Sequence, residues 1–148
     1  MITTEDDLAA VIGDATGPLS IQGGGTRGMA PDGTVLSLAG LSGITRYDPG
    51  ALTLVARAGT PLVEVEAALA AEDQMLAFEP MDHRGLLGTT GEPTIGGVVA
   101  GNVSGPRRVQ AGAARDFMLG VRFDDGPRPI TVSSMPSLSR YSPISGAS

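Results

Sequence analysis

The 148-residue sequence contains no cysteine and no tryptophan, and aromatic residues make up only 3% of it. Without cysteine, the chain has no disulfide, no thiolate metal site, no iron–sulfur cluster of its own and no cysteine nucleophile. This composition is compatible with a reducing compartment. The scarcity of aromatic residues means that a core has to be built from alanine, valine, leucine and isoleucine.

Clustered positive charge and long apolar runs are also missing. The formal net charge is −6, and Arg107-Arg108 is the only adjacent cationic pair, so the electrostatic footprint of a nucleic-acid-binding protein is absent. No apolar run reaches the length of a transmembrane helix, and the segment "MITTEDDLAA" is acidic where a signal peptide would be basic. We expect a cytoplasmic protein that reaches a membrane only through partners.

What the sequence does contain is glycine and proline, at 22 and 11 residues, together with 41% hydrophobic residues. The length is that of one domain with its own core. The high glycine content favours tight turns and close backbone approaches over long helices. These features suit a ligand site that is built from loops.

The order of the expected elements indicates an α/β or α+β domain with a small mixed sheet. A helix with Thr3 or Thr4 as N-cap and Gly13 as its end opens the chain. The clearest helix has Thr60 as N-cap, Pro61 at its first position and Leu62, Val65 and Leu69 at helical spacing, and it extends to Glu72. Strands are expected between them, in 18–22, in 34–38 and in a hairpin that pairs 44–47 with 52–58 around Asp48-Pro49-Gly50.

The stretch "SIQGGGTRG", residues 20–28, formally matches the dinucleotide fingerprint GxGxxG. In that fingerprint the glycines open a helix, but here Pro31 and Gly33 follow and break one. The loop therefore joins two strands, and a Rossmann fold is disfavoured. Two interpretations remain open: a loop whose backbone amides hold a ligand, or a glycine-rich surface turn.

A second glycine-rich stretch, residues 86–112, combines seven glycines with threonine, serine and asparagine and has few side chains large enough to fill a core. Such a backbone forms nests that hold phosphate and the polar edge of a heterocycle. The alternative is a low-complexity loop, although a structureless loop of this length is uncommon in a compact domain.

The motifs "IQGGGTRG", "ALTLVARAGTPL" and "TIGG" occur in this order, and from about Ile21 to Phe123 the sequence resembles the FAD-binding subunits of bacterial glycolate oxidases. These are vanillyl-alcohol-oxidase-type flavoproteins with the PCMH fold. The resemblance implies an α+β fold, corresponding to the N-terminal portion of a PCMH-type FAD-binding domain, and FAD as cofactor. It also implies that the flavin accepts a hydride from the α-carbon of a 2-hydroxy acid such as glycolate.

The same resemblance implies the binding residues. The first loop would lie on the FAD pyrophosphate through Gly23, Gly24, Gly25, Thr26 and Arg27. The second would line the flavin and its ribityl chain through Pro80, Asp82, Thr94, Ile95, Gly96, Gly97, Ala100, Asn102 and Gly105. From the residues alone, an alternative remains for two of these positions: Arg27 as a solvated arginine and Asn102 as a loop-capping amide.

His83, the single histidine, is a candidate for a catalytic base or for covalent flavin attachment. Family members that attach FAD through histidine typically do so from the first glycine loop, where this chain has Thr26. We therefore expect His83 to help order the segment "EPMDHRG", and the residues identify no catalytic group.

The sequence departs from the family after "GVRFDDG". We expect a partial FAD-binding domain over 1–126 and a divergent Ser/Pro-rich segment over 127–148, mobile from Ser133, with strand character only at Ile130–Val132. The missing continuation puts an active site in doubt. Two functions remain: an FAD-dependent oxidoreductase subunit, or a truncated, non-catalytic subunit that acts in assembly. The implied partners are a second FAD subunit and an iron–sulfur subunit, with self-association through an unpaired sheet edge as a further expectation.

Overall fold

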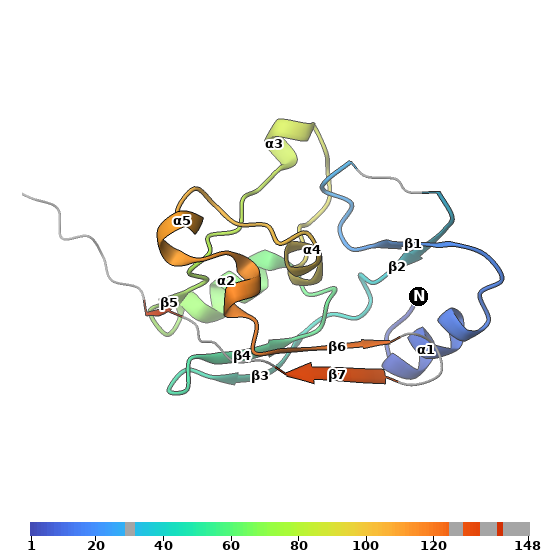
Figure 1. Cartoon of the computed structure of the whole chain (residues 1–148), viewed down its shortest axis with the longest axis horizontal. Coiled ribbons are helices and arrows are strands. Elements are labelled where there is room, and N and C mark those ends of the chain that lie inside the picture. Colours follow the sequence, from blue (N-terminus) through green and yellow to red (C-terminus); the bar gives the residue numbers. More distant parts are fainter. Residues whose placement is uncertain (29–31, 125–128, 134–138, 141–148) are drawn as a thin grey trace, which may run out of the picture.

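The computed structural model describes residues 1–28, 32–124, 129–133 and 139–140 (Figure 1). The helices are α1 (Glu5–Gly13), α2 (Leu62–Ala70), α3 (Arg84–Leu87), α4 (Ile95–Ala100) and α5 (Arg108–Ala111), with the 3-10 helix η1 (Ala114–Phe117). The strands are β1 (Leu19–Gln22), β2 (Thr34–Ser37), β3 (Ile44–Asp48), β4 (Thr53–Ala56), β5 (Gln74–Met75), β6 (Gly120–Asp124), β7 (Pro129–Ser133) and β8 (Ser139–Arg140). In the view of Figure 1, β3, β4, β6 and β7 run along one side of the molecule, and α3 projects from the opposite side.

Helix α1 begins at a capping box, and Thr4, one of the two expected N-cap residues, is the cap. The Thr4 hydroxyl accepts a hydrogen bond from the Asp7 amide at 3.1 Å, and the Asp7 carboxylate accepts one from the Thr4 amide at 3.2 Å. These bonds, led by the Thr4 side chain, lower the pKa of Asp7. Leu8 and Ile12 of the helix pack on a small cluster formed by Ile2, Leu36 and Leu41.

The two predicted strands that flank the first glycine loop are present and pair in parallel. In β1 and β2, Leu19 lies opposite Thr34 and Gln22 opposite Ser37. The loop leaves the carboxyl end of β1, so its glycines lie at a strand end, where ligands bind in open α/β sheets. Leu38, which we expected in the second strand, follows directly after it.

The predicted hairpin is formed by β3 and β4, which are antiparallel with Tyr47 opposite Leu54. Its turn is closed by the Asp48 carboxylate, which accepts a hydrogen bond from the Ala51 amide at 3.0 Å. The second strand is shorter than expected, because Leu52 adopts a left-handed φ of 52° and belongs to the turn.

Helix α2 contributes the centre of the main core. Val65 and Leu69 are fully buried, and they pack with Leu76, Phe78 and Val98 while the β3–β4 hairpin covers the cluster. Burying one such side chain stabilises the fold by about 1.5–3 kcal/mol. The predicted apolar spacing is therefore confirmed as the core-facing side of this helix.

The predicted cap of α2 is wrong in detail. Pro61 occupies the N-cap position, and the helix ends at Ala70 instead of Glu72. The buried Thr60 hydroxyl donates to the Arg57 carbonyl oxygen at 2.7 Å and accepts from the Gly43 amide at 2.9 Å. A buried hydroxyl has to be hydrogen-bonded, and Thr60 uses the preceding turn instead of the helix end.

Beyond η1, strand β6 pairs antiparallel with β7, with Phe123 opposite Ile130. The Ile130–Val132 strand character lies inside β7, and β8, which pairs with β5, adds a strand at Ser139–Arg140 that the sequence did not indicate. Most of the expected mobile segment, residues 134–138 and 141–148, lies outside the described residues.

Candidate functional site

The two glycine-rich stretches lie against each other. A Cβ on Gly23 would overlap the Thr94 hydroxyl, and a Cβ on Gly24 would overlap the Glu92 carbonyl oxygen. A hydrogen bond also joins the two stretches, because the Thr89 hydroxyl donates to the Thr26 carbonyl oxygen at 2.6 Å. The absence of side chains at the two glycines is therefore what allows the two stretches to meet, and of the predicted residues it brings Gly23 against Thr94.

Among the described residues, most backbone amides of the first loop have no hydrogen-bond partner in the protein. Within the described residues, no hydrogen bond is donated by the amides of residues 23–27. Gly25 has a φ of 68°, a conformation that L side chains rarely adopt and that occurs in the backbone nests that bind anions. Free amides in such a turn form a concave donor surface that fits an anion.

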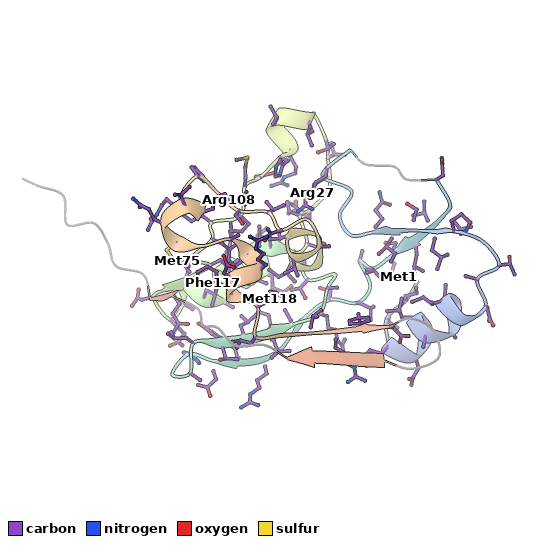
Figure 2. All side chains as sticks on the ribbon, viewed as in Figure 1. Met1, Arg27, Met75, Arg108, Phe117 and Met118 are labelled. Atoms are coloured by element: carbon purple, nitrogen blue, oxygen red, sulfur yellow. The ribbon has the colours of Figure 1, made fainter. Side chains whose placement is uncertain are left out.

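Arg27 brings a positive charge to this loop (Figure 2). Its side chain is half-buried and lies over Gly101, where a Cβ would be 2.8 Å from the guanidinium carbon. Burial lowers the pKa of Arg27, although a guanidinium stays charged at neutral pH. Among the residues that the structure describes, it forms no ion pair and no hydrogen bond. A partly desolvated cation without a counter-charge favours an anionic ligand.

The composition of the second stretch suggested a loop, but residues 95–100 form the short helix α4. Its first amides are already used: Ile95 donates to the Thr60 carbonyl oxygen at 2.9 Å and Gly96 to the Ala58 carbonyl oxygen at 2.9 Å. The next amide, of Gly97, donates to the hydroxyl of the N-cap residue Thr94 at 3.3 Å. The N-terminus of α4 is thus joined to the turn before α2, and its first amides hold protein oxygens.

Close packing explains Gly96, where a Cβ would be 2.7 Å from both the Cβ and the carbonyl oxygen of Ala58. Ile95 packs on the main core, and Ala100 is exposed at the far end of the helix. Among the predicted flavin-lining residues of α4, only Ala100 therefore presents an exposed side chain.

Asn102 has a structural partner. Its side-chain oxygen accepts a hydrogen bond from the Arg115 amide at 3.0 Å, and the neighbouring Ser104 hydroxyl accepts one from the Ala114 amide at 2.9 Å. Its φ of 47° is left-handed, which asparagine tolerates better than most residues. This geometry fits the loop-capping interpretation of Asn102, because its oxygen fixes the start of η1.

Glu79, directly before Pro80, has a strained backbone. Glu79 has a φ of 44°, which is unusual for a residue with a side chain and disfavoured before proline. It is held by an ion pair with Arg107 at 3.1 Å, and its carbonyl oxygen would be 2.5 Å from a Cβ on Gly105. Backbone strain of this kind costs about 1–3 kcal/mol and persists where the surroundings enforce it. Gly105 is therefore required by packing.

A depression of about 530 Å³ is lined in part by Pro80, which is the only predicted site residue among its described lining residues. Glu66 also lines it, and burial, together with the charge of Asp82, raises the pKa of that carboxyl group. The described residues contain no group of three or more His, Asp or Glu side chains placed to hold a metal ion.

The sequence reasoning missed Arg84, which joins Asp82 to the turn at Gly91 and Glu92. The Arg84 guanidinium is 2.8 Å from an Asp82 carboxylate oxygen and 3.1 Å from a Glu92 carboxylate oxygen. Its hydrogen bonds to Asp82 lower the pKa of that carboxyl group. His83 is the residue before α3, and its carbonyl oxygen accepts the Leu87 amide at 2.9 Å. The only signal for Arg84 was its position inside "EPMDHRG".

A mixed α/β arrangement in which a glycine-rich strand end meets a second glycine-rich segment is characteristic of PCMH-type flavoprotein domains. The profile of the family described as "FAD binding domain" matches residues 1–127, so this chain belongs to that family. The fold is that of the N-terminal part of its domain.

Among curated proteins, the chain is similar to glycolate oxidase subunit GlcE of Escherichia coli (strain K12), with 45% identity over 124 residues. The matched region is 82% of this chain and 33% of that subunit, so the chain spans about a third of the length of the relative. No helix among the described residues has the length and apolar character needed to cross a membrane.

Proposed function

We propose that this chain binds FAD, as part of an oxidoreductase subunit acting on glycolate or another 2-hydroxy acid. The observation that carries the proposal is the first loop: its amides lack protein partners, and the half-buried cation Arg27 lacks a counter-charge within the described residues. Both features fit a diphosphate. Membership of the FAD-binding domain family and the likeness to a glycolate oxidase subunit support this choice among anions.

In the proposed complex, residues 23–26 hold the pyrophosphate through backbone amides, and Arg27 supplies charge. Pro80, Asp82 and residues 94–105 form the wall for the flavin and its ribityl chain. When bound, the flavin supplies hydride acceptance from the α-carbon of the substrate, which is chemistry that no side chain can perform. The protein's own part is binding and orientation.

The two loops contribute unequally in this proposal. The first loop offers free amides, whereas the first amides of α4 already hold the carbonyl oxygens of Thr60 and Ala58. The phosphates are therefore the main anchor, and the second stretch contributes mainly shape. ADP, which carries the diphosphate without the flavin, should bind measurably.

The absorption spectrum of the purified chain is the first test, because bound flavin colours the protein yellow. The next test is titration, in which flavin fluorescence measures the binding of FAD and calorimetry measures the binding of both FAD and ADP. Because the chain has no tryptophan, protein emission interferes little with the flavin signal. A colourless chain that binds neither ligand contradicts the proposal. FAD binding without ADP binding would show that the flavin wall is the anchor.

Replacing Arg27 tests the charge. Hydrogen bonds to charged groups contribute about 1.5–3 kcal/mol, so Arg27→Gln should weaken FAD binding by about 10- to 150-fold. Arg46→Gln, which removes an exposed arginine from β3, is the matched control and should bind as the unmodified chain does. Equal affinities for the two variants would show that Arg27 does not contact the ligand.

Association with other chains is the second function we propose, and specific observations favour it. Within the described residues each sheet has only two strands, so each strand has one edge without a strand partner. Ile21 and Val35, on adjacent strands, are 63% and 62% exposed. Unpaired edges with apolar side chains favour pairing with another chain. The proposed partners are a second FAD subunit, an iron–sulfur subunit or a second copy of this chain. A strict monomer by sedimentation at high concentration would contradict pairing between copies.

A further inference from the structure

Arg84 connects two segments through all three of its guanidinium nitrogens. On one side, Nε is 3.1 and 3.0 Å from the two Asp82 carboxylate oxygens, and Nη2 is 2.8 Å from one of them. On the other side, Nη1 donates to the Gly91 carbonyl oxygen and to a Glu92 carboxylate oxygen, both at 3.1 Å. A planar fork that holds a carboxylate in two-point contact fixes its own orientation, which the flexible ammonium group of lysine does not.

The Gly91–Glu92 turn held by Arg84 is the part of the second stretch that touches the first glycine loop. A Cβ on Gly24 would be 2.6 Å from the Glu92 carbonyl carbon, and a Cβ on Gly91 would overlap the Gly24 carbonyl oxygen. Among the described residues, Arg84 forms no hydrogen bond and no ion pair with the first loop, so its effect has to pass through this turn. The turn therefore packs against the loop whose amides have no partner among the described residues.

The charges around Arg84 distinguish it from Arg27. Asp82 and Glu92 surround Arg84 with two carboxylates, and these contacts raise its pKa. An arginine already shared between two carboxylates has little charge to offer to a phosphate. The two arginines at this end of the molecule thus have different partners, with Arg27 left without a counter-charge among the described residues.

We propose that Arg84 is a positioning residue that holds the Gly91–Glu92 turn against the first glycine loop and so sets the shape of the anion site. The second part of this proposal, the effect on ligand affinity, rests on the proposed function. The first part concerns the protein alone and is tested without any ligand.

The ligand-free test measures backbone order parameters by NMR for the amides of Gly24, Gly25, Gly91 and Glu92. In the unmodified chain we expect values near 0.85, as for rigid backbone, and in Arg84→Gln a fall toward 0.6. Arg84→Lys, which keeps the charge but not the fork, should give intermediate values. Arg46→Gln is the control and should leave all four amides unchanged. Unchanged order parameters in Arg84→Gln would overturn the proposal, whatever the outcome with FAD.

The ligand test compares FAD and ADP affinities in the same variants. Arg84→Gln should weaken both ligands by a similar factor of about 2–5, because a disturbed phosphate site affects both, and Arg84→Lys should recover part of the loss. Loosened loops with unchanged affinity would overturn the link to the anion site. If the unmodified chain binds no FAD, the proposed function fails, while the order parameters still decide the positioning role. The amide spectrum of each variant shows whether that variant remains folded.

Discussion

Adding one methyl group at Gly24 should separate the two glycine-rich stretches. Gly24 does not have a positive φ, so alanine at this position meets no backbone strain and the effect comes from the contact alone. The new Cβ would overlap the Glu92 carbonyl oxygen and lie 2.6 Å from its carbon, where about 3.5 Å or more is a normal carbon–carbon separation. Both contact atoms belong to the backbone, so no side chain can rotate away, and one loop has to move by about 1 Å.

Overpacking of this kind costs about 1–3 kcal/mol. We therefore expect Gly24→Ala to lower the free energy of unfolding by that amount in urea denaturation and to weaken FAD binding by about 5- to 150-fold. Gly85→Ala is the matched control, because a Cβ on this glycine of α3 meets nothing within 4 Å, and it should leave affinity unchanged. If Gly24→Ala retained both the stability and the FAD affinity of the unmodified chain, the inferred contact between the two stretches would be wrong.

Three further predictions concern stability. Leu69→Ala should lower the free energy of unfolding by about 2–5 kcal/mol in urea denaturation, because Leu69 is fully buried. The control Val63→Ala, on the exposed side of α2, should change it by less than about 1 kcal/mol. Equal effects of the two substitutions would contradict the assigned core face. Thr4→Ala should reduce stability by about 0.5–2 kcal/mol in thermal denaturation through loss of the α1 cap, and an unchanged transition would contradict the assigned cap. The pKa of Asp82 is lowered by Arg84, so the contribution of this pair is present above pH 3.8 and is lost as pH falls through the lower folded value. NMR titration of the Asp82 carboxyl group in Arg84→Gln should return its midpoint toward 3.8, and an unchanged midpoint would contradict the assigned pairing.

Local patterns were sufficient to predict much of the fold. The Thr4 cap, the Leu62, Val65 and Leu69 spacing, and the hairpin around Asp48 are signals within a few residues of each other, and the structure contains all three features. The same applies to the strand that runs into the first glycine loop. Local propensity and periodicity act through neighbouring residues, and for that reason they can be read along the chain.

Other features were decided by contacts between distant parts of the chain. The Thr89 hydroxyl meets a carbonyl oxygen 63 positions earlier in the sequence, and the amides of Ile95 and Gly96 are taken by oxygens that precede α2. No pattern near Arg84 indicates that its guanidinium spans Asp82 and Glu92. The sequence by itself determined the glycines that make a bare backbone. Only the tertiary structure decided which amides stay free, because each possible partner comes from a segment that packing alone brings close.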